Sequence, residues 1–215
     1  MGLFKRKPKV PESLAGAGFG IHGNSVHFGR FPITGMKPEP IPWIVVETDG
    51  ESSTLLSAYG LYYTQFSGDP WCDREFGKSP VRRWLNDTFL EAAFNEEERE
   101  KLLYTSVPEE KQEDEDDEPW IHGSAYGKVW LPGKSDIEKW FAEGSRIAYN
   151  TPFAEAQAKA LGEDISTSHE CLYWTRTFNH RAVNPLVYFY MFGDARHGNP
   201  TDNHAIRPVI RVDLT

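Results

Sequence analysis

The last forty residues constrain the fold most, because three strand-like runs alternate there with polar loops. The runs are YWTR at 173–176, YFYMFGD at 188–194 and RPVIRVDL at 207–214. The loops at 177–184 and 194–203 are rich in His, Asn, Arg, Asp and Gly. We predict that the terminal runs form one small sheet, which holds the tips of these two loops beside each other.

The rest of the chain indicates a single α+β domain at 25–215, preceded by a flexible leader at 1–24. Alternating or apolar runs at 26–31, 41–48 and 53–57 predict strands, and Asp49-Gly50 supplies the turn of a hairpin. Aromatic residues make up 13% of the chain and bury large areas with few rotatable bonds, so a loop-rich domain can still form a core. Hairpins and helices without regular βαβ alternation favour the α+β class.

Four helix starts can be predicted from capping residues. Ser79 precedes Pro80, which suits the first position of a helix, and Thr151-Pro152 repeats the pattern before an Ala-rich run ending at Gly162. Asn95 and Ser135 each stand three residues before a Glu, as in a capping box, and we expect the second of these helices to run to Gly144. In the first helix we expect one buried face at 3.6-residue spacing, made of Val81, Trp84, Leu85, Thr88 and Ala92.

The net charge of −9 is concentrated in one segment. Residues 109–118 (EEKQEDEDDE) carry eight acids and one lysine, and their mutual repulsion predicts a disordered, solvated acidic loop. The remaining body is also acidic, so we expect no nucleic acid as a partner. No run approaches the length of a membrane span and no export signal is present, so we expect a cytoplasmic protein without a membrane partner.

An ordered set of short motifs runs through residues 25–215. It consists of FGRFPIT at 28–34, IPWIV at 41–45, LLS at 55–57, VRRWLN at 81–86, KVWL at 128–131, EKWF at 138–141, YWTR at 173–176 and IRP at 206–208. Together they resemble a widespread bacterial domain family of unknown function, which is regarded as C-type-lectin-like and as a distant relative of sulfatase-modifying factors.

The resemblance implies a compact domain with two small sheets, flanking helices and a binding role. Related lectin-like domains, including the variable proteins of diversity-generating retroelements, bind ligands through their C-terminal strands and loops. Formylglycine-generating enzymes of the sulfatase-modifying group use cysteines near the C-terminus. Here Cys171 follows Cys72 at a distance and stands alone, so we do not expect that oxidase activity.

We therefore predict a non-catalytic recognition domain that presents its C-terminal loops to a protein or small polar ligand. Loops on a rigid scaffold commonly carry function, and these loops offer donors, acceptors and rings. We expect no catalytic residue and no cofactor, and the oligomeric state is left open. The predicted ligand-binding residues are Arg176, Asn179, His180, Arg181, Tyr188, Tyr190, Arg196, His197, Asn199 and Asp202.

Several residues have a second interpretation. Arg176 could equally pair with internal carboxylates, and Tyr188 and Tyr190 could be buried against a second layer. An enzyme reading, as a metal-assisted oxidase or hydrolase, would use His180, His197 and His204. His169 and Cys171 could form a nucleophilic pair, although burial of Cys171 is favoured. A bridge between Cys72 and Cys171 is also open, with two buried thiols favoured.

Overall fold

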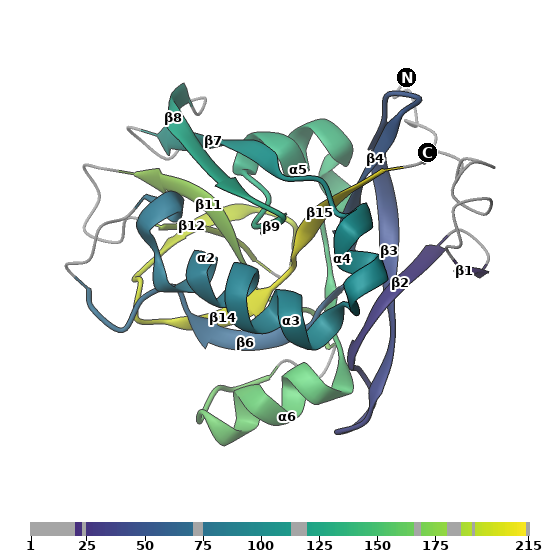
Figure 1. Cartoon of the computed structure of the whole chain (residues 1–215). Helices are drawn as coiled ribbons and strands as arrows, with labels where there is room; N and C mark the ends of the chain where they lie inside the picture. The colour runs from purple at the N-terminus through teal and green to yellow at the C-terminus, as the bar shows by residue number, and fades with distance from the viewer. Residues whose placement is uncertain are drawn as a thin grey trace.

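The protein folds into two main sheets with helices on their outer sides (Figure 1). The computed structural model describes residues 25–70, 75–112, 120–165, 169–179, 186–190 and 192–213, and for residues 20–22, 120 and 122 the main chain alone. Sheets with mainly antiparallel pairing and separate helices confirm the α+β class.

The first sheet combines the N-terminal hairpin with the last strand of the chain. Its order is β1 (Gly20–His22), β2 (Ser25–Pro32), β3 (Pro38–Thr48), β4 (Ser52–Ser57), β15 (Val209–Asp213) and β9 (Val129–Trp130). The predicted hairpin is confirmed: Asp49 Oδ1 accepts N–H bonds from Glu51 and Ser52, and Gly50 takes a φ of 96°, which favours glycine. The leader prediction is wrong for residues 20–22, because they pair with β2.

The second sheet contains most of the C-terminal region. Its order is β13 (Ala195–Gly198), β12 (Leu186–Phe189), β11 (Tyr173–Asn179), β14 (Asn203–Ile206) and β6 (Tyr62–Gln65); β7 (Thr105–Gln112) also pairs with β11, and β8 (Trp120–Gly127) pairs with β7. The prediction of one terminal sheet is therefore wrong in part, because β15 joins the first sheet and the predicted 194–203 loop contains β13. A short parallel pair, β5 (Tyr59–Gly60) and β10 (Tyr149–Asn150), stands apart.

The acidic segment begins as strand rather than as loop. Residues 109–112 belong to β7, and Glu109 and Glu110 are buried. The prediction of a disordered loop is wrong for these residues, because main-chain N–H groups and the Arg176 guanidinium bind their carboxylates. The part at 113–118 lies outside the described residues.

The first predicted helix starts where its capping residues place it. Ser79 Oγ accepts the N–H of Arg82 at 3.1 Å, and α2 (Pro80–Trp84) continues through a π-helical turn, η2 (Leu85–Phe89), into α3 (Leu90–Ala93). The predicted buried face is wrong beyond Leu85, because a π turn holds more residues than an α turn. The buried positions recur every four residues, at Val81, Leu85, Phe89 and Ala93.

The remaining helices differ in how well their starts were predicted. Asn95 and Glu98 form the expected capping box of α4 (Glu96–Lys101), and Thr151 caps α6 (Pro152–Ala160). The Ser135 cap is wrong: the N-cap of α5 (Lys134–Trp140) is Gly133, two residues earlier, and the Ser135 hydroxyl donates to Glu110 instead. The helix ends at Trp140 rather than at Gly144. Short 3₁₀ turns, η1 (Phe76–Lys78) and η3 (Glu143–Ser145), complete the set.

Aromatic side chains fill the core between sheets and helices. Phe31 lies edge-on to Phe89 at 5.2 Å between ring centroids, and Trp43 donates its indole N–H to Phe28 O at 2.7 Å. Cys171 is also buried there, as favoured, while Cys72 lies outside the described residues. Among the helices that the structure describes, none is long and apolar enough to cross a membrane.

Candidate functional site

The predicted ligand-binding residues fall into separate places. Arg176 and Asn179 lie on β11 and are buried, whereas Tyr188 on β12 and Arg196 on β13 stand opposite each other in the β12–β13 pair. His197 follows on β13, Tyr190 follows β12, and Asn199 and Asp202 lie in the turn before β14. His180 and Arg181 lie outside the described residues.

Tyr188 and Arg196 end a row of side chains that crosses the second sheet. The Tyr188 ring lies edge-on to Trp174 at 6.0 Å and 4.2 Å from the His204 ring. Trp174 is fully buried and donates its indole N–H to Thr64 O at 3.1 Å. Arg196 is 57% exposed in its side chain and pairs with Asp194 at 3.8 Å. Arg196 is the most exposed side chain of this row.

The Asn199 and Asp202 side chains bond within their own turn. Asp202 Oδ2 accepts the Asn199 N–H at 2.8 Å, and Asn199 Oδ1 accepts both the N–H and the hydroxyl of Thr201. Side chains that bond their own main chain in this way stabilise a turn. These two residues therefore shape the segment between β13 and β14.

The described residues give no geometric support to the hypothesis of a metal centre built from the C-terminal histidines. Within the described part of the chain, no three His, Cys, Asp or Glu residues come together as a metal site. Burial lowers the pKa of His204 to about 4, and its Nε2 has no hydrogen-bond partner among the described residues. His204 is therefore a neutral ring packed between Trp174 and Tyr188.

Cys171 does not have the properties of a nucleophile. It is 1% exposed, and burial raises the pKa of its thiol to about 12, so the thiolate is scarce at neutral pH. His169 is turned toward α6, where its Nδ1 lies 2.6 Å from Glu155 Oε1. The favoured reading of a core thiol agrees with this arrangement.

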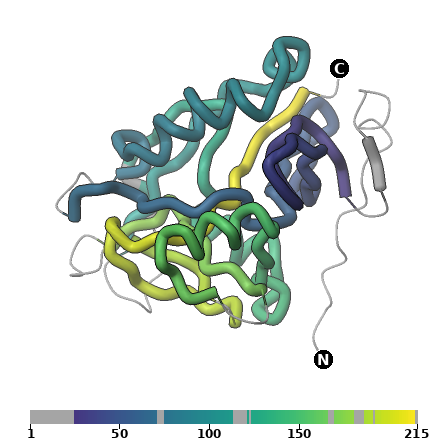
Figure 2. Tube along the Cα trace, turned by 90° about the horizontal axis from the view of Figure 1, so that it is seen from below, coloured from purple at the N-terminus to yellow at the C-terminus, as the bar shows by residue number. Residues whose placement is uncertain are grey.

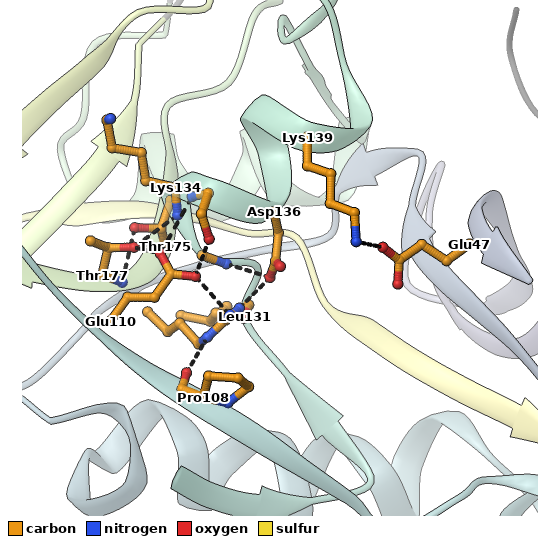
Figure 3. Close-up of polar contacts among 12 residues, drawn as sticks. Glu47, Pro108, Glu110, Leu131, Lys134, Asp136, Lys139, Thr175 and Thr177 are labelled. Carbon is orange, nitrogen blue, oxygen red and sulfur yellow. Dashed lines mark hydrogen bonds and ion pairs between the residues drawn. The ribbon is translucent and has the colours of Figure 1, made fainter. Parts of the chain in front are cut away.

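Arg176 is buried in a polar cluster, and its partners Pro108, Glu110, Leu131 and Asp136 are labelled in Figure 3. Its guanidinium donates to Pro108 O at 2.6 Å, to Leu131 O at 3.1 Å and to Glu110 Oε1 at 2.8 Å, and it also pairs with Asp136. Arg176 therefore pairs with internal carboxylates, as its second interpretation expected. These contacts connect β7, β11 and α5 at one point.

Glu110 is fully satisfied in this cluster. Besides Arg176, it accepts the Ser135 hydroxyl at 2.5 Å and the Thr177 hydroxyl at 2.7 Å. Thr177 Oγ1 in turn accepts the Lys134 N–H at 2.8 Å, so β11 contacts the first turn of α5. Burial of a polar side chain is costly unless hydrogen bonds satisfy it, and these partners meet that need for Glu110.

Beside this cluster, α5 and the first sheet enclose a polar groove of two joined hollows. The outer hollow has a volume of about 370 Å³ and the inner hollow one of about 140 Å³, and Glu47, Thr54 and Arg211 line both. Thr48, Asp49, Ser52 and Lys139 complete the outer hollow. The inner hollow is completed by Thr105, Ser106, Val107, Pro108, Trp130, Asp136, Trp140 and Arg176.

Two ion pairs span the outer hollow. Lys139 Nζ on α5 lies 2.5 Å from Glu47 Oε1 on β3, and this pairing raises the pKa of Lys139 (Figure 3). Arg211 on β15 pairs with Asp49 and donates to Ser52 Oγ at 2.7 Å. Main-chain N–H bonds from Ser52 and Glu51 lower the pKa of Asp49. The outer hollow therefore presents two anions and two cations.

Trp140, which lines the inner hollow, carries a hydrogen-bond donor without a partner among the described residues. The indole N–H of Trp140 is buried and finds no acceptor in the part of the chain that the structure describes. Such a group loses its bond to water without gaining a protein partner. The indole nitrogen has almost no accessible surface, so a ligand acceptor in the inner hollow would bond it only after neighbouring side chains move.

Sequence reasoning missed this groove except for Arg176. Lys139 and Trp140 were expected on a helix, and Arg211 on a strand, but nothing local shows that they meet. Lys139 and Glu47 are 92 residues apart, and Arg211 and Asp49 are 162 apart. The only signal in the sequence was the polar side of the strand at 207–214.

The fold and the groove define an α+β domain with a candidate binding site. The amino-acid sequence also identifies the family to which the chain belongs. A family model described as a domain of unknown function, DUF6273, matches residues 51–214. The chain therefore belongs to this family. A search of curated proteins and a search of solved structures found no match. The match includes most of the groove and begins in the β3–β4 turn.

Proposed function

We propose that this protein is a non-catalytic recognition domain that binds a small polar ligand in the groove between α5 and the first sheet. The observation that carries the proposal is Trp140, which lines a hollow that opens onto four charged side chains and whose buried indole N–H has no partner among the described residues. A largely preformed concave site with a few convergent polar groups is typical of small-molecule binding.

The charges of the groove favour a ligand that carries both signs. Glu47 and Asp49 already neutralise Lys139 and Arg211. An anion would displace a carboxylate and leave it without its cation, and a cation would do the converse. A zwitterion can replace both partners of one pair, so its binding leaves no charge unmatched. The proposed ligand class is therefore small zwitterions, of which free α-amino acids are the simplest.

The indole N–H of Trp140 offers a direct test by NMR. The L-α-amino acids are added one at a time to ¹⁵N-labelled protein, and Trp140→Phe identifies the Trp140 signal. At least one amino acid should shift this signal in a saturable way. Lys139→Ala should weaken its binding by roughly tenfold or more, because a charged hydrogen bond is lost. If no amino acid moves the Trp140 signal, the proposed ligand class is wrong.

The second candidate site is the C-terminal hairpin formed by β12 and β13, which would bind another protein. Arg196 stands opposite Tyr188 and is exposed, and the 66% exposed Phe192 lies edge-on to Tyr190 at 5.9 Å between ring centroids. Arg196→Ala serves as the matched control for Lys139→Ala, because both remove one exposed cation. Binding that is lost in Arg196→Ala but kept in Lys139→Ala would assign recognition to the C-terminal loops instead.

Three finer expectations remain part of the proposal. The fold would be C-type-lectin-like. The motif resemblance supports this, and so do the C-terminal strands β15 and β14, which pair with the N-terminal strands β4 and β6 in the two sheets. The protein would be bacterial and cytoplasmic, with no nucleic acid or membrane as partner. The enzymatic alternative is tested by elemental analysis of purified protein, since a stoichiometric metal would support it.

A further inference from the structure

Among the described strands, β6 forms an edge of the second sheet, and its own sequence carries none of the features that usually protect an edge. Its sequence, Tyr62–Gln65, contains no charge and no proline, and it pairs with β14 without a bulge. Natural sheets commonly protect an edge with a charge, a proline or a bulge, or cover it with another element, because an open edge pairs readily with other chains. Helix α6 runs beside this edge, and β6 passes between α6 and the α2–α3 helix in both views (Figures 1 and 2).

The main chain of β6 points alternately toward β14 and toward α6. Tyr63 stands opposite Ala205, whose N–H donates at 2.7 Å to Leu172 O on the far side of β14. Tyr63 therefore does not exchange bonds with Ala205, and its N–H points outward. Because strand groups alternate with a period of two, Gln65 also faces outward.

On the outward side, a glutamine side chain substitutes for a missing strand. The Tyr63 N–H donates to Gln157 Oε1 of α6 over 3.4 Å, which is longer than an ordinary N–H···O bond. A side-chain amide oxygen at this place has the same chemistry as a peptide carbonyl. It is a weak bond that a better-placed carbonyl could replace.

A hollow of about 430 Å³ lies along this edge. It runs between β6 and α6 and shares no residue with the polar groove. Leu161, which is 51% exposed, and Ala160 give it an apolar side at the end of α6. The hollow is lined by Tyr62, Tyr63, Thr64, Gln65, Gln157, Ala160, Leu161 and Asn203.

We propose that this hollow takes an extended segment of another polypeptide, which adds to β6 as a further strand. Its main chain bonds the outward groups of Tyr63 and Gln65, and Gln157 swings away. An uncharged, small or aliphatic side chain of the segment packs on Ala160 and Leu161. In this mode of recognition, main-chain bonds provide the affinity and pockets for alternate side chains provide the selectivity. Because α6 flanks the edge, a single strand enters more easily than the sheet of a second copy.

Main-chain pairing tolerates many sequences, so a generic strand-forming peptide is a valid probe. The blocked peptide acetyl-Val-Thr-Val-Thr-Val-amide is added at millimolar concentrations to the ¹⁵N-labelled full chain. The amide signals of Tyr63 and Gln65 should shift in a saturable way. The same peptide N-methylated at both threonines should bind at least roughly tenfold more weakly, because its strand edge lacks those donors.

Paired lysine variants on α6 locate the binding. Ala160→Lys places a charge in the hollow and should weaken peptide binding by roughly tenfold or more. Ala156→Lys, one turn earlier and outside the hollow, should leave it within about twofold. Absence of saturable shifts, equal binding of the N-methylated peptide, or equal effects of both variants would each overturn the proposal. So would the same shifts arising from dimerisation without peptide, measured by sedimentation.

Discussion

At the residue scale, His204 couples the stability of the second sheet to pH. Its folded pKa of about 4 lies below the ordinary 6.5 because burial disfavours the charged ring. As the pH falls from 6.5 toward 4, His204 takes up a proton in the unfolded chain but remains neutral in the folded chain. The free energy of unfolding should therefore decrease across this window, by about 3 kcal/mol from this residue.

Urea unfolding at pH 7, 5.5 and 4 measures this decrease. His204→Phe keeps a ring between Trp174 and Tyr188 and removes the titrating group. The variant should lose less stability than the parent chain as the pH falls, whatever its stability at pH 7. Parallel pH profiles for the two proteins would show that His204 does not titrate as the structure indicates.

The Cys171 thiol should be inert in the folded protein. It is buried and its pKa is raised to about 12, so both access and ionisation oppose alkylation. In a Cys72→Ser background, iodoacetamide should label Cys171 in urea but not in buffer at pH 8, as followed by mass spectrometry. Rapid labelling of the folded chain would instead support the hypothesis that His169 and Cys171 form a nucleophilic pair.

Single residues were predictable where their role is local. Ser79, Asn95 and Thr151 cap their helices as expected, because a cap depends only on the next three residues. Arg176 was ambiguous, since its partner Glu110 lies 66 residues away and was assigned to a solvated run. A carboxylate in an acidic stretch shows no local sign of being buried.

At the element scale, the start of α5 depends on a close approach between Gly133 and Glu110. A Cβ on Gly133 would lie 2.0 Å from Glu110 Oε1, which is held by Arg176, Ser135 and Thr177. The Gly133 N–H also donates to Asp136 Oδ2 at 2.9 Å and so closes the first turn of the helix. Only glycine allows α5 to begin this near β7.

Gly133→Ala should therefore reduce the free energy of unfolding by about 1–3 kcal/mol, as overpacking does. Gly144→Ala is the matched control, because nothing lies within 4 Å of its added Cβ. The control should stay within about 0.5 kcal/mol of the parent. Equal denaturant midpoints for both variants would mean that the Gly133–Glu110 contact relaxes without cost.

The helix at 80–93 shows where a periodicity argument fails. Its boundaries follow from Ser79 and Pro80, but Thr88 and Ala92 are exposed and Phe89 and Ala93 are buried. The cause is the π turn at Leu85–Phe89, which rotates all later residues around the axis. The hydrophobic pattern alone is compatible with either register, because Leu90 and Phe94 flank both faces.

At the scale of the whole molecule, β15 joins parts of the chain that are far apart in sequence. It lies between β4 and β9, and Val209 stands opposite both Leu56 and Trp130. A chain ending at residue 208 should lose cooperative unfolding in urea, whereas one ending at residue 213 should keep it. A cooperative transition in the shorter chain would show that the first sheet is stable without β15.

The arrangement of the three C-terminal runs could not be predicted from their sequences. Each run was predicted as strand from its own residues, and β11 and β15 confirm this for two of them. The prediction for 188–194 is wrong in part, because β12 ends at Phe189 and the Gly193 N–H closes a turn on Tyr190 O. Their distribution over two sheets depends on the N-terminal hairpin, which offers β4 as an edge for β15. Pairing between distant segments leaves no local pattern in the sequence. We therefore predicted that the loops at 177–184 and 194–203 lie together, and we did not predict the groove.

The position of β15 also affects how the protein is made. While the ribosome still holds residues beyond 208 in its exit tunnel, the emerged hairpin β3–β4 has an edge that nothing covers. Newly made chains should therefore depend on chaperones, or on rapid release, more than a fold completed from its N-terminal side would. Arg211 arrives with β15, so the groove acquires its second cation after all its other lining residues have been made.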